Sequence, residues 1–277
     1  MIVDNEKILQ ELKYRMGNFN KEQVEKMVLD PFLRDFTYRF CWSSNALEGN
    51  TLSLEETISL LEYDEVRGGH TFTEYEEAKN LYYAIQKMFL PISPKKITEA
   101  WIQEVNGYIR RTSGEYRRKE VYVGNLTEAV YYPPRAENVK TEMEVYLQNV
   151  NFVGEDIDRI LDETARQHIL FERIHPFQDG NGRTGRLILN YMLEKEGYPS
   201  IALKHDAKQD YKKSLEAWQI RGNSKMFLDV VKNCVLDELQ ERIHIITVTR
   251  ETIKALNMDL NYENSEEQMV LDDDLEI

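Results

Sequence analysis

The sequence has little glycine, proline or cysteine and no long hydrophobic run. Its 277 residues include 13 glycines and 7 prolines, too few for a collagen-like, disordered or turn-rich all-β chain, so the composition favours helices. The two cysteines, Cys41 and Cys234, form no CxxC pair, which argues against a disulfide framework or a zinc site and fits a reducing compartment. No window of about 18 uncharged apolar residues occurs, and the N-terminus contains no apolar stretch of signal-peptide length. We therefore expect a soluble, cytoplasmic protein.

Basic charge is also scarce. Lysine and arginine total 35 against 49 acidic residues, which gives a net charge of −14. Because neutralising phosphates requires a basic surface, this balance excludes a chain whose main work is to coat nucleic acid or anionic membrane. Residues 263–277 hold seven of the acids and no base, so we expect a solvated, disordered acidic tail there.

Apolar residues recur at helical spacing through most of the chain. Helices are expected over residues 73–89, 95–110, 137–150, 156–174, 184–196, 207–221 and 225–256. Earlier helical stretches precede them, and one begins after Ser53, which forms a capping box with Glu56. Residues 120–134 break the pattern with alternating valines, a Gly-Asn turn and two prolines, which predicts a short β-hairpin. The expected fold class is all-α: a helical bundle with one short β-hairpin and an N-terminal helical extension.

Residues 175–186, which we call the signature loop, read His-Pro-Phe-Gln-Asp-Gly-Asn-Gly-Arg-Thr-Gly-Arg and contain a GxGxxG pattern. A dinucleotide-binding fold needs a strand before these glycines, whereas residues 157–174 have the pattern of an amphipathic helix, so that interpretation fails. The loop instead joins two helices. Gly180 and Gly182 allow the backbone to expose successive N–H groups, and the helix that follows directs its positive end to the same space. The loop is therefore expected to bind an anion.

Charged side chains in the loop extend this chemistry. Arg183 and Arg186 are three residues apart, on one face of the first helical turn, and their forked guanidiniums suit phosphate oxygens. Asp179 can hold a Mg²⁺ ion that bridges two phosphate groups. His175, held extended by Pro176, can accept a proton from an incoming hydroxyl at neutral pH. A base, a metal carboxylate and a polyphosphate site are thus expected within one short loop.

The loop resembles the complete signature of Fic-domain proteins, HPFx(D/E)GNGRxxR, with no departure at any fixed position. The sequence Gly-Glu-Tyr-Arg at 114–117 is similar to the GxYR that precedes the family's β-hairpin flap, so residues 95–235 resemble the Fic core. Members typically transfer AMP from ATP to a serine, threonine or tyrosine hydroxyl of a target protein. The resemblance implies ATP, Mg²⁺ and a Fic-fold bundle between an N-terminal extension (1–94) and a C-terminal helical segment (236–262), followed by the acidic tail.

The same resemblance assigns roles to the loop residues. His175 would be the catalytic base, Asp179 the Mg²⁺ ligand and Arg186 the ligand of the γ-phosphate. Phe177 would anchor the loop in the core. The remaining phosphate contacts would come from Gly180, Asn181, Gly182 and Arg183.

Two further regions gain a role from the resemblance. The flap would align a target segment by strand addition, although an ordinary surface hairpin is the alternative. Its expected contact residues are Val121, Tyr122, Val123, Tyr131 and Tyr132. Tyr211 and Gln219 lie on one face of a later helix, in the region where the family binds the nucleotide base. Core packing is the alternative there, and the family often has an asparagine near position 219.

Residues 44–49, Ser-Asn-Ala-Leu-Glu-Gly, resemble the (S/T)xxxE(G/N) inhibitory motif of autoinhibited Fic proteins, in the subclass whose inhibitory helix precedes the core. Ser44 and Glu48 are four residues apart and share a helix face. By the resemblance, Glu48 would pair with Arg186 and deny it to the γ-phosphate, and it could also position water for removing AMP. The alternative is that Asn45 and Glu48 form a capping box.

The expected activity is therefore that of a protein adenylyltransferase that modifies a target protein and itself. One alternative is a nucleotide-sensing regulatory or interaction module without catalysis. Another is a Fic enzyme that transfers UMP or a different phosphate-containing group. No nucleic-acid or membrane partner is expected, and the adjacent Tyr82 and Tyr83 could serve an interface between copies of the chain.

Overall fold

The computed structural model describes residues 30–89, 96–124, 129–152, 157–203, 208–242 and 244. Its elements follow one another as α3 (Asp30–Leu47), α4 (Leu54–Tyr63), α5 (Phe72–Ala84), the π-helical turn Ile85–Phe89, α6 (Glu99–Arg110), β1 (Val123–Gly124), β2 (Ala129–Tyr131), the 3₁₀ turn Ala136–Asn138, α7 (Val139–Asn149), α8 (Ile157–Ile174), α9 (Asn181–Lys195) and α10 (Lys208–Arg221). Residues 225–242 form a further helix. The expected all-α class is confirmed. The acidic tail lies outside the described residues, as do residues 1–29 and most of the segment expected at 236–262.

Local sequence signals set several helix ends. The predicted capping box is present at the start of α4, where the Ser53 side chain accepts from the backbone N–H of Glu56 and the Glu56 side chain accepts from the Ser53 N–H. Helix α9 begins at Asn181, three residues before the expected start, because Gly180 serves as its N-cap in a left-handed conformation, with φ of 80°. The non-helical part of the signature loop is therefore three residues shorter than the sequence predicts.

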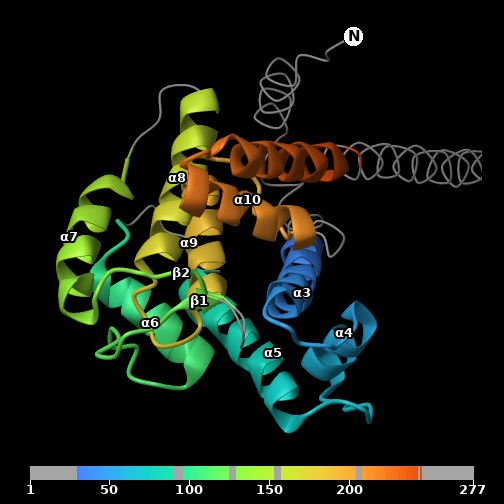
Figure 1. The fold of residues 1–277 in the computed structure, drawn as a ribbon. Coiled ribbons are helices and arrows are strands. Elements are labelled where there is room, and N and C mark those ends of the chain that lie inside the picture. The colour runs from blue at the N-terminus through green and yellow to red at the C-terminus, as the bar shows by residue number, and fades with distance from the viewer. Residues whose placement is uncertain are drawn as a thin grey trace, which may run out of the picture.

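The long helices α8 and α9 pack side by side at the centre of the bundle (Figure 1). Helices α3, α5, α6 and α7 surround one side of this pair, and their apolar faces meet in a core that includes Phe36, Leu81, Ile102, Met143 and Phe171. A second cluster joins α8 and α9 to α10 and the helix at 225–242. Burial of apolar surface in these two clusters stabilises α8 and α9, so both helices that flank the connecting loop are fixed in position.

The predicted hairpin is present as a short antiparallel pair. Val123 in β1 pairs with Tyr131 in β2, and an irregularity follows between Val123 and Gly124. Residues 125–128, at its tip, lie outside the described residues. Within the described ranges, no helix is both long and apolar enough to cross a membrane.

Candidate active site

The backbone of the signature loop turns sharply after α8. His175 has a φ of 50°, in the left-handed region, so the expectation that Pro176 holds it extended is wrong. The His175 N–H still donates to the carbonyl of Phe171 (3.0 Å), which continues the hydrogen bonding of α8 for one more residue. Arg117 stabilises this turn by donating hydrogen bonds to two carbonyls that no longer have a partner within a helix. Its Nε donates to the His175 carbonyl (2.8 Å) and its backbone N–H donates to the Pro176 carbonyl (2.9 Å).

The Asn181 side chain closes the loop on itself. Its amide nitrogen donates to the Phe177 carbonyl and its amide oxygen accepts from the Phe177 N–H, both at 2.9 Å. Phe177 is buried, as expected, with its ring 5.5 Å from that of Tyr116. These bonds give the Asn181 side chain a structural role, so its contribution to the expected phosphate cradle comes down to its backbone N–H at the start of α9.

The glycines leave room for neighbouring charged side chains. A Cβ on Gly180 would lie 2.9 Å from Arg110 Cγ and from Asn106 Nδ2. A Cβ on Gly182 would lie 2.2 Å from Glu48 Oε1 and 2.8 Å from Arg186 Nη1. Both glycines thus allow a close approach of neighbouring side chains, and their role as a phosphate cradle stays a prediction.

Two titratable groups of the loop suit the chemistry expected of them. Burial lowers the pKa of His175 below its usual value, and the charge of Arg117 acts in the same direction, so the imidazole is neutral at pH 7 and can accept a proton. Asp179 is 58% exposed, with Oδ1 accepting from the Gly180 N–H (2.5 Å) and Oδ2 lying 2.8 Å from Arg110 Nη2. A single exposed carboxylate beside the expected phosphate site fits Mg²⁺, which usually takes one or two carboxylates together with substrate phosphates. No group of three or more candidate metal ligands occurs among the residues that the structure describes.

Arg183 points away from solvent toward α3 and α5. Its side chain is only 2% exposed, and Nη1 lies 3.0 Å from Glu77 Oε1 and 3.3 Å from Asn45 Oδ1. Its Nη2 is 3.9 Å from Asp179 Oδ1, and its Nε is buried with no hydrogen-bond partner in the described part of the chain. Glu77 therefore neutralises the first arginine of the loop, a contact that the sequence did not predict.

Arg186 is bound by the end of α3. Its Nε donates to Ser44 Oγ (2.8 Å), and its Nη2 donates to the Ser44 carbonyl (2.8 Å) and to Glu48 Oε1 (2.7 Å). Desolvation alone would raise the pKa of Glu48, but the charge and hydrogen bond of Arg186 hold it below its usual value. Helix α3 ends at Leu47 and the Asn45 side chain donates to the Cys41 carbonyl, so the alternative in which Asn45 caps a helix start is wrong. The predicted juxtaposition of Ser44, Glu48 and Arg186 is present.

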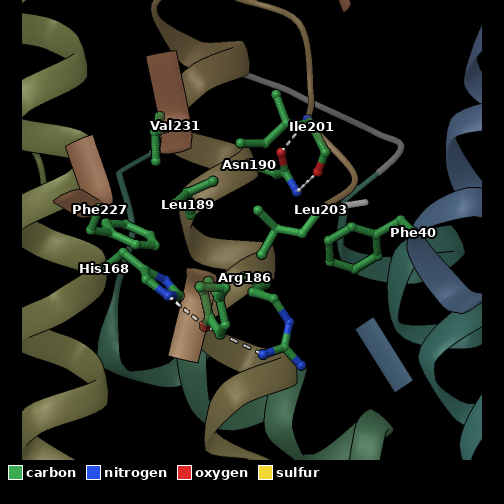
Figure 2. A pocket seen from close by; sticks show the side chains of 10 residues that line it. Phe40, His168, Arg186, Leu189, Asn190, Ile201, Leu203, Phe227 and Val231 are labelled. Atoms are coloured by element: carbon green, nitrogen blue, oxygen red, sulfur yellow. Dashed lines mark hydrogen bonds between the residues drawn. The ribbon is translucent and has the colours of Figure 1, made fainter. Parts of the chain in front are cut away.

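Tyr211 lies behind Arg186. Its hydroxyl is 3.0 Å from His168 Nε2 and 3.4 Å from Arg186 Nη1, the contacts drawn as dashed lines between these side chains in Figure 2. The cavity beside it has a volume of about 10 Å³, room for about one water molecule, so it cannot take an adenine ring. Tyr211 therefore packs in the core and steadies Arg186, and its assignment to the base remains a prediction. The Gln219 side chain lies outside the described residues.

The flap residues stand at the edge of an open groove. Tyr122 and Tyr132 are exposed, and with Glu120, Val121 and Arg135 they line a hollow of about 580 Å³. Val123 and Tyr131 are half-buried in the hairpin itself. The predicted flap residues are thus gathered at one surface, and Arg117 links this segment to the signature loop by donating to the carbonyls of both Pro134 and His175.

Three charged residues of the site gave no signal in the sequence. Glu77 on α5 contacts Arg183 of the loop and Arg110 on α6 contacts Asp179, although both helices are far from the loop along the chain. Glu172 on α8 is buried beneath the loop, where a Cβ on Gly185 would lie 2.7 Å from its Oε1. Burial raises the pKa of Glu172 to about 7, against the opposing charge of Arg186. Only the position of Glu172, three residues before His175, could have drawn attention.

Residues 95–193 match the model of the Fic/DOC family. The chain is 27% identical over 258 residues to protein adenylyltransferase fic-1 of Caenorhabditis elegans, covering 89% of this chain and 49% of that protein. It is 26% identical over 210 residues to protein adenylyltransferase Fic of Nematostella vectensis, covering 73% and 48%. The chain thus spans about half the length of these curated relatives.

Solved structures share the fold. A Fic domain containing signaling protein from Bacteroides thetaiotaomicron superposes with a TM-score of 0.75 at 25% identity, covering 88% of this chain and 97% of that one. Fic-1 of C. elegans, residues 134–508, gives a TM-score of 0.72 at 23% identity over 88% of this chain and 73% of the other, a likeness of fold alone. Residues 95–193 thus form a Fic/DOC domain within a chain that has the all-helical Fic fold and is a distant homologue of the protein adenylyltransferases Fic.

Proposed function

We propose that this protein transfers AMP from ATP to a serine, threonine or tyrosine hydroxyl of a target protein and of itself, and that Glu48 holds this activity back. The observation that carries the proposal is the clustering of a neutral histidine, an exposed carboxylate and a helix N-terminus in one loop, with the loop's second arginine already bound by Glu48. Each of these groups has a part in nucleotidyl transfer. The distant homology to proteins named adenylyltransferases supports the same reaction.

The chemistry uses the chain's own groups in a simple order. His175 takes the proton of the target hydroxyl as the hydroxyl oxygen attacks the α-phosphorus. A bond forms between that oxygen and phosphorus, the bond to the bridging oxygen breaks, and pyrophosphate leaves with the electron pair. Backbone N–H groups at the start of α9 stabilise the charge on the phosphates. Asp179 would hold Mg²⁺, which when bound neutralises phosphate charge.

Glu48 restrains the reaction by competing for Arg186. The Glu48 carboxylate is ionised at neutral pH and bound at 2.7 Å to the guanidinium that the γ-phosphate would use. A charge-assisted contact of this kind is worth about 1.5 to 3 kcal/mol. ATP that cannot displace Glu48 binds without its γ-phosphate fixed, and its α-phosphorus is then not aligned with His175.

The flap is proposed to bind the target. Its short strands offer backbone groups to an extended segment, and the groove beside Tyr122 and Tyr132 could take a side chain of that segment. Recognition of backbone more than sequence would allow more than one target. The same geometry permits a second copy of this chain to present a hydroxyl, which accounts for the expected self-modification.

The test is to incubate the protein, and its Glu48→Gly variant, with Mg²⁺ and ATP labelled at either the α- or the γ-phosphate. Label retained on protein from the α position alone supports AMP transfer. Retention from the γ position indicates a kinase-like reaction and contradicts the proposal. An equal preference for α-labelled UTP would reassign the nucleotide, and ATP binding without any labelling would favour the nucleotide-sensing module.

A further inference from the structure

Asp179 and Arg183 belong to a closed ring of four alternating charges. Arg110 Nη2 lies 2.8 Å from Asp179 Oδ2, and Arg110 Nη1 lies 3.6 Å from Glu77 Oε1. The same Glu77 oxygen is 3.0 Å from Arg183 Nη1, and Arg183 Nη2 is 3.9 Å from Asp179 Oδ1. Two members come from the signature loop and two from outside it, so the ring joins the loop to α5 and α6.

Contacts along its whole side chain fix the position of Arg110 in this ring. It is the last residue of α6, where a cation is favoured by the helix dipole, and its side chain is 30% exposed. Its aliphatic stem packs against Gly180, since a Cβ there would come within 2.9 Å of Arg110 Cγ. The second Glu77 oxygen accepts from Asn50 Nδ2 (3.3 Å), which fixes the carboxylate that Arg110 faces. The guanidinium is therefore positioned and not merely near Asp179.

We infer that Arg110 is a resident cation that competes with Mg²⁺ for the Asp179 carboxylate and so sets how much Mg²⁺ the protein needs to bind nucleotide. The inference rests on the proposed function, because it takes Asp179 as the metal ligand. Arg110 is a positioning residue: it touches Asp179, and it acts on the metal only through that contact and through its charge.

The physical reason is competition for one oxygen in one small space. Both Asp179 oxygens have a partner, and Oδ2 is held by Arg110. A divalent ion at that oxygen must share it with the guanidinium or displace it, and two cations so close repel each other. Glu77 gives Arg110 a second carboxylate to stay with when it releases Asp179. The ring therefore permits exchange of a guanidinium for a metal without leaving a charge unpaired.

The experiment compares Arg110→Gln with Arg110→Lys in the full chain carrying Glu48→Gly. The readout is binding of a fluorescent ATP analogue at increasing Mg²⁺ concentration, which does not depend on turnover. Arg110→Gln should lower the half-saturating Mg²⁺ concentration by about threefold to tenfold, the effect expected of one charge in a partly solvated site. Arg110→Lys keeps the charge and should stay close to the parent. Arg166→Gln removes another arginine that is paired with an aspartate, on α8, and is the matched control with no expected effect.

An Arg110→Gln variant that needs as much Mg²⁺ as the parent, or more, overturns the inference. So does a lysine variant that behaves like the glutamine variant, since charge would then not be the cause. Asp179→Asn separates this failure from failure of the proposed function. If Asp179→Asn abolishes the Mg²⁺ dependence while Arg110→Gln changes nothing, only the inference fails. If Asp179→Asn leaves the dependence intact, the metal assignment fails and the inference falls with it.

Discussion

The signature loop is bound on one side by the end of α3 and on the other by helices α5 and α6, and the two sets of ion pairs differ in how easily a ligand could displace them. The end of α3 binds Arg186 through Ser44 and Glu48, and the Glu48 side chain is 38% exposed. Helices α5 and α6 bind Arg183 and Asp179 through Glu77 and Arg110, and Glu77 is only 19% exposed and shared between two arginines. A half-exposed carboxylate with one cation can be displaced by a phosphate. A more buried one that serves two cations is a brace.

The two sides therefore have different expected roles: Glu48 regulates activity, and Glu77 stabilises the fold. On the α3 side, Glu48 is the more exposed partner of a buried arginine, so a phosphate can replace it beside Arg186 without leaving that guanidinium unpaired. On the α5 and α6 side, removing Glu77 would leave the buried Arg183 without its main counter-charge, and such losses are costly. We therefore expect changes on the α3 side to alter activity and changes at Glu77 to alter stability.

The largest expected effect on activity comes from His175, which belongs to neither set of ion pairs. In a background that carries Glu48→Gly, His175→Ala should lower AMP transfer by about 100-fold or more, because the base acts on the target hydroxyl. ATP binding should remain nearly intact, because the base acts on the target hydroxyl and not on the nucleotide. Transfer and binding are measured on the same preparation. A variant that keeps more than about a tenth of the labelling would contradict the assignment of the base.

The next effect contrasts the two carboxylates directly. Glu77→Gln should lower the free energy of unfolding by about 2 to 4 kcal/mol, because a buried arginine loses its charged partner. Glu48→Gln, the matched isosteric change, should cost less, about 1 to 2 kcal/mol, because the amide oxygen can still accept from Arg186 and Ser44 keeps two hydrogen bonds to the same guanidinium. Urea denaturation of both variants provides the comparison. Equal losses, or a larger loss for Glu48→Gln, would contradict the claim that Glu77 contributes more to stability than Glu48 does.

A smaller effect concerns the acid beneath the loop. Since the pKa of Glu172 is raised to about 7, the folded protein binds a proton between pH 4.5 and 7 that the unfolded chain does not, and stability falls as pH rises through that window. Glu172→Gln removes this titration and should be about 1 to 3 kcal/mol more stable than the parent at pH 8, with little difference at pH 5. Thermal unfolding at the two pH values measures it. A difference of the same size at both would mean that Glu172 stays ionised.

The sequence predicted those parts of the fold that depend on local pattern. Helix α8 was clear because its apolar residues repeat on one stripe, and α4 because Ser53 and Glu56 can cap its start without help from elsewhere. The sequence predicts the start of α9 three residues too late, because the role of Gly180 as an N-cap depends on its left-handed backbone, which sequence alone does not show. The hairpin was predicted from its valines and its turn.

The site divides in the same way. The loop residues and the Ser44–Glu48 pair were found because short motifs carry them. Glu77 and Arg110 could not be found, since an ion pair between distant helices leaves no periodic trace in the chain, and each alone looks like an ordinary surface charge. The assignment of Tyr211 to the nucleotide base stays a prediction, whereas the contacts of its hydroxyl with Arg186 and His168 could not be predicted from the sequence.

The most direct test of the account is self-labelling by α-labelled ATP in the Glu48→Gly variant, beside the parent and the double variant Glu48→Gly with Arg186→Ala. Losing a contact worth about 1.5 to 3 kcal/mol should raise labelling by roughly 10-fold to over 100-fold. The double variant should lose that gain, because the arginine that Glu48 releases is then absent. Labelling unchanged by Glu48→Gly, or a gain that persists without Arg186, would contradict the claim that Glu48 and the γ-phosphate compete for Arg186.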